Sequence, residues 1–308
     1  MILQTGFRTD IPAFYARWFA NRLTEGFVLV RNPYNPQLVT KYTVSPRVVD
    51  LIGFCTKNPM PMFPYLSLLE PYGQYWFVTI TPYRRDIEPH VPDKLTIIEA
   101  FRKLSDSIGI HRVGWRYDPI LITERYPVKW HIQAFQKMAE TLCGYTTTCV
   151  ISFIDLYAKV LRNFPEARTV SQEEQVQIAK AFAEIGTRYG IRIKGCAENP
   201  TLRKCGIEMN SCFSAEIIEQ ALQAKLCFPK GKSLRSECSC IGGNDIGAYD
   251  SCGHLCRYCY ATSDVQAYYR NRKLHDPSSP LLIGKLLPTD KIHVARQESW
   301  KQSQTELF

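Results

Sequence analysis

The chain has 308 residues, of which 45% are hydrophobic and 22% charged, values typical of a folded soluble protein with one large core or two ordinary ones. No apolar run reaches the roughly eighteen residues of a membrane-spanning helix, and no P-loop, G-x-S-x-G or H-E-x-x-H motif occurs. These absences argue against a membrane protein and against nucleotide-hydrolysing, serine-hydrolase and zinc-protease chemistry. The formal net charge of +9 allows an anionic partner, although a mildly basic enzyme explains it equally well.

Apolar segments of strand type alternate with helical patterns along the first two thirds of the chain. We expect strands at residues 2–5, 27–31, 48–56, 75–81, 112–117, 148–154 and 191–197. We expect helices at 13–23, 93–108, 128–142, 157–163, 172–189 and 215–224. This alternation predicts an α/β fold with a parallel sheet, in the form of a (β/α) TIM-like barrel or partial barrel with the helices outside.

The pattern changes at residue 225, where the chain becomes rich in Gly, Ser and Cys and loses its apolar period. We therefore expect a barrel of residues 1–224 and an appendage of residues 225–308. The appendage would carry a metal cluster and a C-terminal tail, packed on the mouth of the barrel. Within it, residues 265–272 are expected to be helical, and the apolar run 281–287 is expected to pack against the body.

Most of the predicted strands end in polar residues followed by proline. Proline removes a backbone donor, so simple strand termination is one interpretation. Charged side chains at the carboxyl ends of buried parallel strands, however, face the mouth of a barrel, where barrel enzymes have their active sites. We expect one cavity there, lined by the candidate catalytic residues Arg8, Asp10, Lys57, Arg116, Asp118 and Glu198, with Asp155 beside them. The arginine–aspartate pairs two residues apart share a strand face, so they could bind substrate or neutralise each other.

Nine of the twelve cysteines lie between Cys196 and Cys259. The N-terminus lacks the basic and apolar segments of a secretory signal, so we expect a cytoplasmic protein whose reduced thiols bind metal. Cys252, Cys256 and Cys259 form a C-x3-C-x2-C array in one loop. Such a loop fits a zinc site with His254 as the fourth ligand, or an iron–sulfur cluster that keeps one iron open.

The segment GHLCRYCYA, preceded by DIGAYDSC, resembles the cluster motif of radical S-adenosylmethionine (SAM) proteins, in the branch of spore photoproduct lyase and DNA-repair-photolyase-like proteins. With RTDIPAFYARWFANRLTEGFVLVRNPYNP and WRYDPIL, it resembles a widespread bacterial and archaeal domain family of unknown function, over nearly the whole chain. The resemblance implies a [4Fe–4S] cluster on Cys252, Cys256 and Cys259, whose open iron binds SAM. Tyr258 and Tyr260 would then shield the cluster from water, or serve only as packing aromatics.

Two departures from the radical SAM pattern accompany the resemblance. In those enzymes the cysteine loop follows the first strand, so its late position here implies a circularly permuted barrel. The Gly-Gly-Glu segment that holds the amino group of SAM has no obvious counterpart, because Gly242-Gly243 precedes the cysteines and is followed by Asn244.

Four further cysteines predict a second metal site, either an auxiliary iron–sulfur cluster or zinc. They are Cys196, Cys212, Cys238 and Cys240. One of them could instead complete the first cluster, or all could be unligated thiols.

Together these features predict an enzyme that cleaves SAM reductively and abstracts hydrogen from an unknown small-molecule or nucleic-acid substrate. A ferredoxin or flavodoxin would supply the electron. The first alternative is a barrel whose cluster or zinc serves electron transfer or structure without SAM. The second is a nucleic-acid-binding module with a metal-stapled tail, for which YYRNRK at residues 268–273 supplies aromatic and basic side chains.

Overall fold

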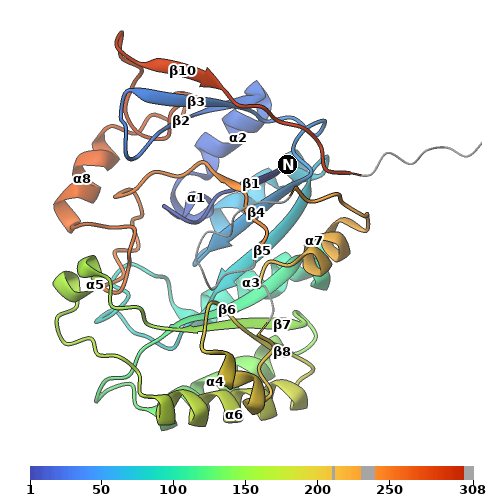
Figure 1. The fold of residues 1–308 in the computed structure, drawn as a ribbon, viewed down its shortest axis with the longest axis vertical. Coiled ribbons are helices and arrows are strands. Elements are labelled where there is room, and N and C mark those ends of the chain that lie inside the picture. Colours follow the sequence, from blue (N-terminus) through green and yellow to red (C-terminus); the bar gives the residue numbers. More distant parts are fainter. Residues whose placement is uncertain (210–211, 230–239, 302–308) are drawn as a thin grey trace, which may run out of the picture.

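The computed structural model describes residues 1–209, 212–229 and 240–301. Seven parallel strands form its main sheet, in the order β8-β7-β6-β5-β4-β1-β9 (Figure 1). The strands are β1 (Ile2–Gln4), β4 (Leu51–Thr56), β5 (Gly73–Thr79), β6 (Val113–Ile120), β7 (Thr148–Phe153), β8 (Arg192–Gly195) and β9 (Asn244–Asp245). The predicted parallel α/β sheet is therefore confirmed. Within the described residues it is open rather than closed, since β8 and β9 are its two edges.

Eight α-helices and three 3₁₀ segments occur in the described part of the chain. The α-helices are α1 (Ile11–Phe14), α2 (Ala16–Glu25), α3 (Lys94–Ile108), α4 (Val128–Leu142), α5 (Ala158–Asn163), α6 (Gln172–Arg188), α7 (Ala215–Leu222) and α8 (Val265–Lys273). The 3₁₀ segments are η1 (Met60–Leu69), η2 (Ile110–Arg112) and η3 (Pro200–Cys205). Local signals explain several ends: Asp93 caps α3, Ser171 and Glu174 form a capping box on α6, and Gly26 ends α2 at a φ of 76°.

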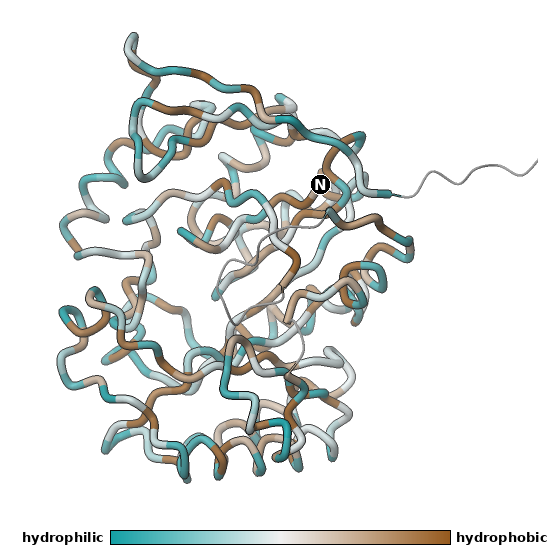
Figure 2. Tube along the Cα trace, in the orientation of Figure 1, coloured by the Kyte–Doolittle hydropathy of each residue, from teal (hydrophilic) through white to brown (hydrophobic). Residues whose placement is uncertain are grey.

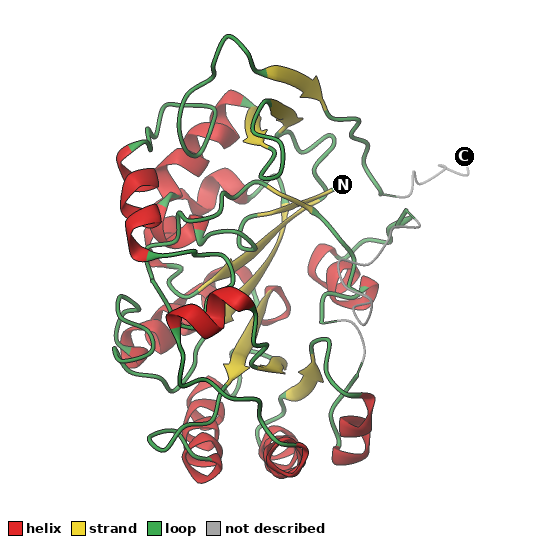
Figure 3. Ribbon diagram, turned by 60° about the vertical axis from the view of Figure 1, so that its left-hand side comes forward, coloured by secondary structure: helices red, strands yellow, loops and turns green. Residues whose placement is uncertain are grey.

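A second sheet holds β2 (Phe27–Arg31), β3 (Leu38–Thr43) and β10 (Lys291–Val294), and it lies at the upper end of the molecule in Figure 3. The prediction that residues 27–31 belong to the parallel sheet was wrong. β2 instead pairs antiparallel with β3, a segment whose polar residues hid its strand character. The short connection of residues 32–37 suits an antiparallel pair, because a parallel crossover needs a dozen or more residues.

The two faces of the main sheet are covered differently. One face packs on the long helices, where Trp115 of β6 stacks on Phe135 of α4 with ring centroids 4.7 Å apart. The other face carries Tyr75 and Phe77 of β5, which pack against Phe213 just before α7. Figure 2 shows hydrophobic residues along the central strands and hydrophilic ones on the outer turns of the helices. Both faces of the sheet are therefore buried, as a parallel sheet requires.

The C-terminal part of the chain returns to the body. Leu281 and Leu282 are buried, and Leu281 forms a bridge with Leu29 of β2, so the predicted packing of the run 281–287 holds for its first residues, whereas Leu286 and Leu287 are exposed. β9 joins the main sheet and β10 the second sheet, both from beyond residue 225. Among the described helices, none is long and apolar enough to cross a membrane.

Candidate functional site

The three-cysteine loop lies over the carboxyl ends of β1, β4 and β5. It follows β9, which pairs in parallel with β1, so that the chain leaves the sheet beside the end of β1. The Tyr260 hydroxyl donates to the carbonyl oxygen of Phe7 at 2.5 Å, and the Tyr258 hydroxyl donates to the Glu88 carboxylate beyond β5. The segments that follow β1 and β5 therefore contact the loop directly.

The thiols of this loop are withdrawn from solvent. Cys256 is buried, and Cys252 and Cys259 are half-buried. Burial raises the pKa of Cys256 to about 12, against the opposing effect of the nearby Lys57 ammonium. The Cys259 sulfur accepts hydrogen bonds from the Ala261 amide at 3.4 Å and the Thr262 hydroxyl at 3.8 Å. Donors of this kind stabilise a metal-bound thiolate and tune an attached cluster.

Glu88 is the hub of the polar network behind Cys256. Its side chain is fully buried and accepts from the Lys57 ammonium at 2.8 Å, the Thr81 hydroxyl at 2.7 Å, the Lys94 ammonium and the Tyr258 hydroxyl. Burial alone would raise the pKa of Glu88, but the two ammonium groups lower it to about 2. Lys57 also lies over the Tyr258 ring, with Nζ 5.6 Å from the centroid. The predicted site residue Lys57 is therefore held in a buried ion network that touches the cysteine loop.

Asp10 lies where the ends of β1 and β4 meet the loop. Oδ1 accepts from the Ala13 amide at 3.0 Å and caps α1, while Oδ2 accepts from the Lys57 amide at 2.8 Å and from His254 Nε2 at 2.9 Å. The other ring nitrogen of His254 faces the carbonyl oxygen of His90 at 3.5 Å. Both nitrogens of His254 are thus directed at protein oxygens, and the imidazole acts here as a tether rather than as a ligand turned toward the thiols.

The two predicted arginine–aspartate pairs are arranged differently. Arg8 pairs with Asp245 of β9 at 2.5 Å and not with Asp10. Arg116 Nε does donate to Asp118 at 3.0 Å, and the Ser152 hydroxyl donates to the other oxygen of Asp118. Arg8 therefore joins the two strands beside the cysteine loop, whereas Arg116 and Asp118 form one unit on the β7 side.

The predicted strand-end residues share one neighbourhood around Cys55. Burial raises the pKa of the Cys55 thiol, and the charges of Arg116, Asp118, Asp10 and Lys57 all act on it. These groups lie on β6 or after the ends of β1 and β4, so the carboxyl ends do converge, and Tyr260 lies near Cys55 and Arg116.

Glu198 lies at the far side of this neighbourhood. Its Oε1 accepts from the Phe153 amide at 2.8 Å. Burial raises the pKa of Glu198 to about 8, with Asp118 and Asp155 adding to the rise. A carboxyl that keeps its proton near neutral pH can serve as a proton donor to a bound substrate.

Three of the four cysteines predicted for a second site also meet. Cys212 Sγ lies 3.5 Å from Cys196 Sγ and 3.2 Å from Cys240 Sγ. Cys238, the fourth member of that prediction, lies outside the described residues. In the portion of the chain that the structure describes, no group of three or more His, Cys, Asp and Glu side chains has a geometry that could hold a metal ion.

Residues 2–261 match the protein family described as Domain of unknown function (DUF1848). The match runs from β1 to the end of the three-cysteine loop. The chain belongs to this family. The predicted membership of a domain family of unknown function is thus confirmed, whereas its likeness to photoproduct lyases stays a prediction. No curated protein matches the chain.

The three-cysteine loop of this DUF1848 protein brings thiols, hydrogen-bond donors and an ammonium group into one neighbourhood. Three thiols lie in one short loop at strand ends, with two donors on Cys259 and the Lys57 ammonium near Cys256. A Cβ on Gly253 would lie 2.6 Å from the Phe14 ring, so the loop packs closely on α1. A charged, sulfur-rich group would find ligands, hydrogen-bond donors and a countercharge here.

Sequence reasoning missed several residues of this site. Glu88 and Lys94 lie outside any strand-end motif, and the significance of Glu88 depends on partners from four separate segments. The basic hexapeptide 268–273 lies entirely in α8, where Tyr268 is buried and Arg272 lies 5.8 Å from the Tyr15 ring centroid. Packing therefore accounts for part of the segment that suggested nucleic-acid binding.

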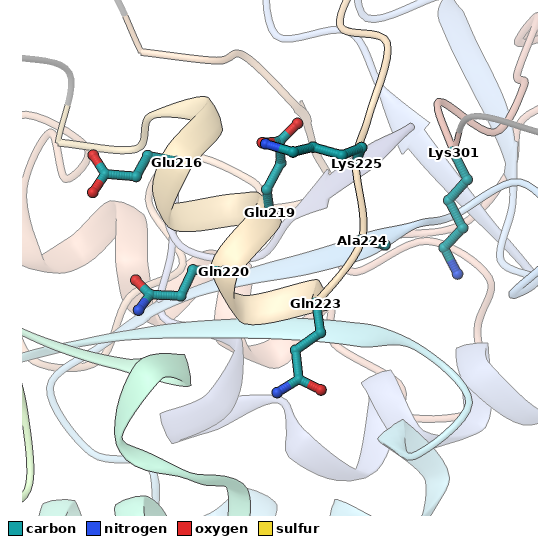
Figure 4. Close-up of a pocket in the computed structure, with 7 residues that line it drawn as sticks. All are labelled: Glu216, Glu219, Gln220, Gln223, Ala224, Lys225 and Lys301. Atoms are coloured by element: carbon teal, nitrogen blue, oxygen red, sulfur yellow. The ribbon is translucent and has the colours of Figure 1, made fainter.

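A surface depression of about 1030 Å³ lies elsewhere, along α7 and the chain that follows it (Figure 4). Its lining residues are Glu216, Glu219, Gln220, Gln223, Ala224, Lys225 and Lys301. Lys225 pairs with Glu219 at 2.8 Å across one wall. None of the predicted site residues lines this depression.

Proposed function

We propose that this chain is an iron–sulfur enzyme of the radical SAM type, with its cluster on Cys252, Cys256 and Cys259. The observation that carries the proposal is the parallel pairing of β9 with β1. Because of this pairing, the cysteine loop emerges at the carboxyl edge of the sheet although it comes last in the chain. That edge is where α/β enzymes bind ligands.

A permuted partial barrel explains the order of the elements. Read across the sheet from β9, the strands follow as β9, β1, β4, β5, β6, β7 and β8. This is the order of a barrel in which the strand that precedes the cysteine loop comes first and every later strand adds to the same side. A change in where the chain starts would move the loop from the beginning of the sequence to its end without moving the site.

The residues around the loop would have different roles in this enzyme. When bound, the cluster would supply an electron to SAM at an open iron. Cys252, Cys256 and Cys259 would hold it, and the amide and hydroxyl donors on Cys259 would stabilise thiolate charge. The buried network of Glu88 and Lys57 would keep water from the Cys256 side.

A substrate would meet the polar groups on the β6 side of the site. Arg116 can orient an anionic or carbonyl group, and Glu198 can give or take a proton at its carboxyl. The groups that receive the amino acid end of SAM would come from the residues after β1. The pair Gly242-Gly243 does not serve this purpose, because a Cβ on Gly243 would lie 2.7 Å from Gln4 and packing against β1 accounts for the glycine.

Anaerobic reconstitution with iron and sulfide tests the proposal. We expect four irons per chain at the loop, a change in the EPR signal of the reduced cluster when SAM is added, and release of 5′-deoxyadenosine. The Cys256→Ala variant should lose both iron and SAM cleavage, whereas Cys143→Ala, at an exposed position after α4, should keep both.

Each outcome separates the candidates. A cluster that forms without any response to SAM would favour electron transfer or a structural role. Zinc in place of iron at the loop, or SAM cleavage that survives Cys256→Ala, would overturn the proposal.

A further inference from the structure

The second group of cysteines lies in the gap between the two edges of the main sheet. Cys196 directly follows β8, Cys240 precedes β9, and Cys212 lies between η3 and α7. The Ile241 amide donates to the Phe213 carbonyl oxygen at 3.0 Å, which brings the residues after Cys240 and Cys212 together. Three segments that are distant in sequence therefore deliver their thiols to one point of the fold.

The sulfur–sulfur distances discriminate between kinds of site. At 3.5 Å and 3.2 Å, the contacts of Cys212 with Cys196 and Cys240 are much longer than the roughly 2.05 Å of a disulfide. Four thiolates at about 2.3 Å from one tetrahedral ion lie roughly 3.8 Å apart, close to the spacing seen here. In a [4Fe–4S] cluster each cysteine binds a different iron, which separates the sulfurs further. The spacing favours one shared ion over a cluster.

The surroundings suit such an ion. Cys212 is only 5% exposed and packs with Phe213, Ile217 and Tyr75, so solvent does not compete for its sulfur. The Arg116 guanidinium is near enough to act electrostatically on Cys196 and Cys212, and it would offset the negative charge of several thiolates around a divalent cation. The Cys212 thiol contacts both of the other thiols. Rotation about the side-chain bonds of the three cysteines would direct all three sulfurs at one ion.

We propose that Cys196, Cys212 and Cys240 bind a single Zn²⁺ ion that joins the β8 edge of the sheet to the β9 edge. Three thiolates leave the fourth tetrahedral position for a further ligand. The ion holds α7 and its flanking segments over the sheet face that carries Tyr75 and Phe77. It also holds β9, and with it the three-cysteine loop, beside β1. This zinc site is separate from the proposed iron–sulfur site and does not depend on it.

Metal content of single variants tests the proposal. The chain purified without added metal should hold one zinc by mass spectrometry of the elements, and Cys212→Ser and Cys240→Ser should each lose it. Cys252→Ser should keep the zinc while losing reconstituted iron, so failure of one site is distinguishable from failure of the other. Cys143→Ser, which changes an exposed thiol, is the matched control.

Cobalt keeps the test decisive if a serine variant fails to fold. Wild-type protein stripped of metal and titrated with Co²⁺ should show thiolate charge-transfer absorption and the visible bands of a tetrahedral ion, saturating at one equivalent and reversed by Zn²⁺. Zinc retained in a folded Cys212→Ser variant would overturn the proposal. So would a disulfide found among the three cysteines, or iron in place of zinc at this site.

Discussion

His254 Nε2 donates a hydrogen bond to Asp10 Oδ2 at 2.9 Å, and this contact ties the three-cysteine loop to the end of β1. The same carboxylate caps α1 through Ala13 and accepts from the Lys57 amide at the end of β4. One buried aspartate thus fixes the position of the loop relative to two strands. These contacts make Asp10 a positioning residue for the loop, and its predicted catalytic role stays a prediction.

The Asp10→Asn variant separates the helix-capping role of Asp10 from its hydrogen bond to His254. Asparagine caps a helix as well as aspartate does, but it forms no charge-assisted hydrogen bond with His254, so we expect a loss of about 1–2 kcal/mol in the free energy of unfolding. Iron retained by the loop should fall as well. Urea unfolding measures the first effect. Asp93→Asn, at the exposed cap of α3, should change stability by less than about 0.5 kcal/mol; equal effects of the two variants would refute the tethering role.

We expect a larger loss of stability when Glu88 is replaced, because its carboxylate is the counterion of two buried ammonium groups. In Glu88→Gln, Lys57 and Lys94 lose their shared counterion, and we expect the free energy of unfolding to fall by about 3–5 kcal/mol. Replacing Lys94 by Met in the same chain should recover part of this loss, since it removes one of the unpaired charges. Glu99→Gln on the exposed face of α3 is the control. A Glu88→Gln protein as stable as the control would show that the network contributes nothing.

Local patterns in the sequence were sufficient for most of the main sheet. Alternating apolar segments located six of its seven strands, and the polar strand ends pointed to Lys57 and Arg116, because the carboxyl ends of parallel strands converge. β9 was missed, since two residues carry no period. β2 was placed in the wrong sheet, because a strand pattern does not reveal its partner.

Site residues could be predicted only where the residues that act together are close in the sequence. The spacing of Cys252, Cys256 and Cys259 is visible in eight residues of sequence, whereas Glu88 stands in a loop without any pattern. Its importance comes from Thr81, Tyr258 and two lysines that the fold brings to it. Long-range partners of this kind require the tertiary structure.

We expect His131 to make the stability of the folded chain depend on pH. The ring is fully buried in α4, with Nδ1 accepting from the Tyr117 hydroxyl at 2.9 Å and Nε2 donating to the Leu121 carbonyl oxygen at 2.9 Å. A neutral imidazole satisfies both contacts. Burial lowers the pKa of His131 from 6.5 to about 4.

Stability should therefore decline as the pH falls through this window. The unfolded chain gains a proton near pH 6.5 and the folded chain only near pH 4, so acidification favours unfolding by up to about 3 kcal/mol. Urea unfolding between about pH 7 and pH 4 measures the slope. His131→Gln should be less stable at neutral pH but show a shallower slope, whereas His111→Gln, at an exposed site, should keep the wild-type slope. An unchanged slope in His131→Gln would contradict the assignment.

At Gly253 the cysteine loop packs so closely on α1 that no side chain fits. A Cβ at this position would lie 2.6 Å from Phe14 Cε1 and 2.8 Å from the Tyr268 hydroxyl oxygen, while a Cβ on Gly242 would meet nothing within 4 Å. The Phe14 ring is held edge-on against His254, with centroids 4.7 Å apart, so it has little room to retreat. Gly253→Ala should therefore push the loop away from α1, costing about 1–3 kcal/mol and lowering the iron bound after reconstitution. Gly242→Ala should leave both quantities unchanged. Thermal unfolding and iron analysis of the two proteins make the comparison, and equal iron content would mean that the position of the loop on α1 does not govern cluster binding.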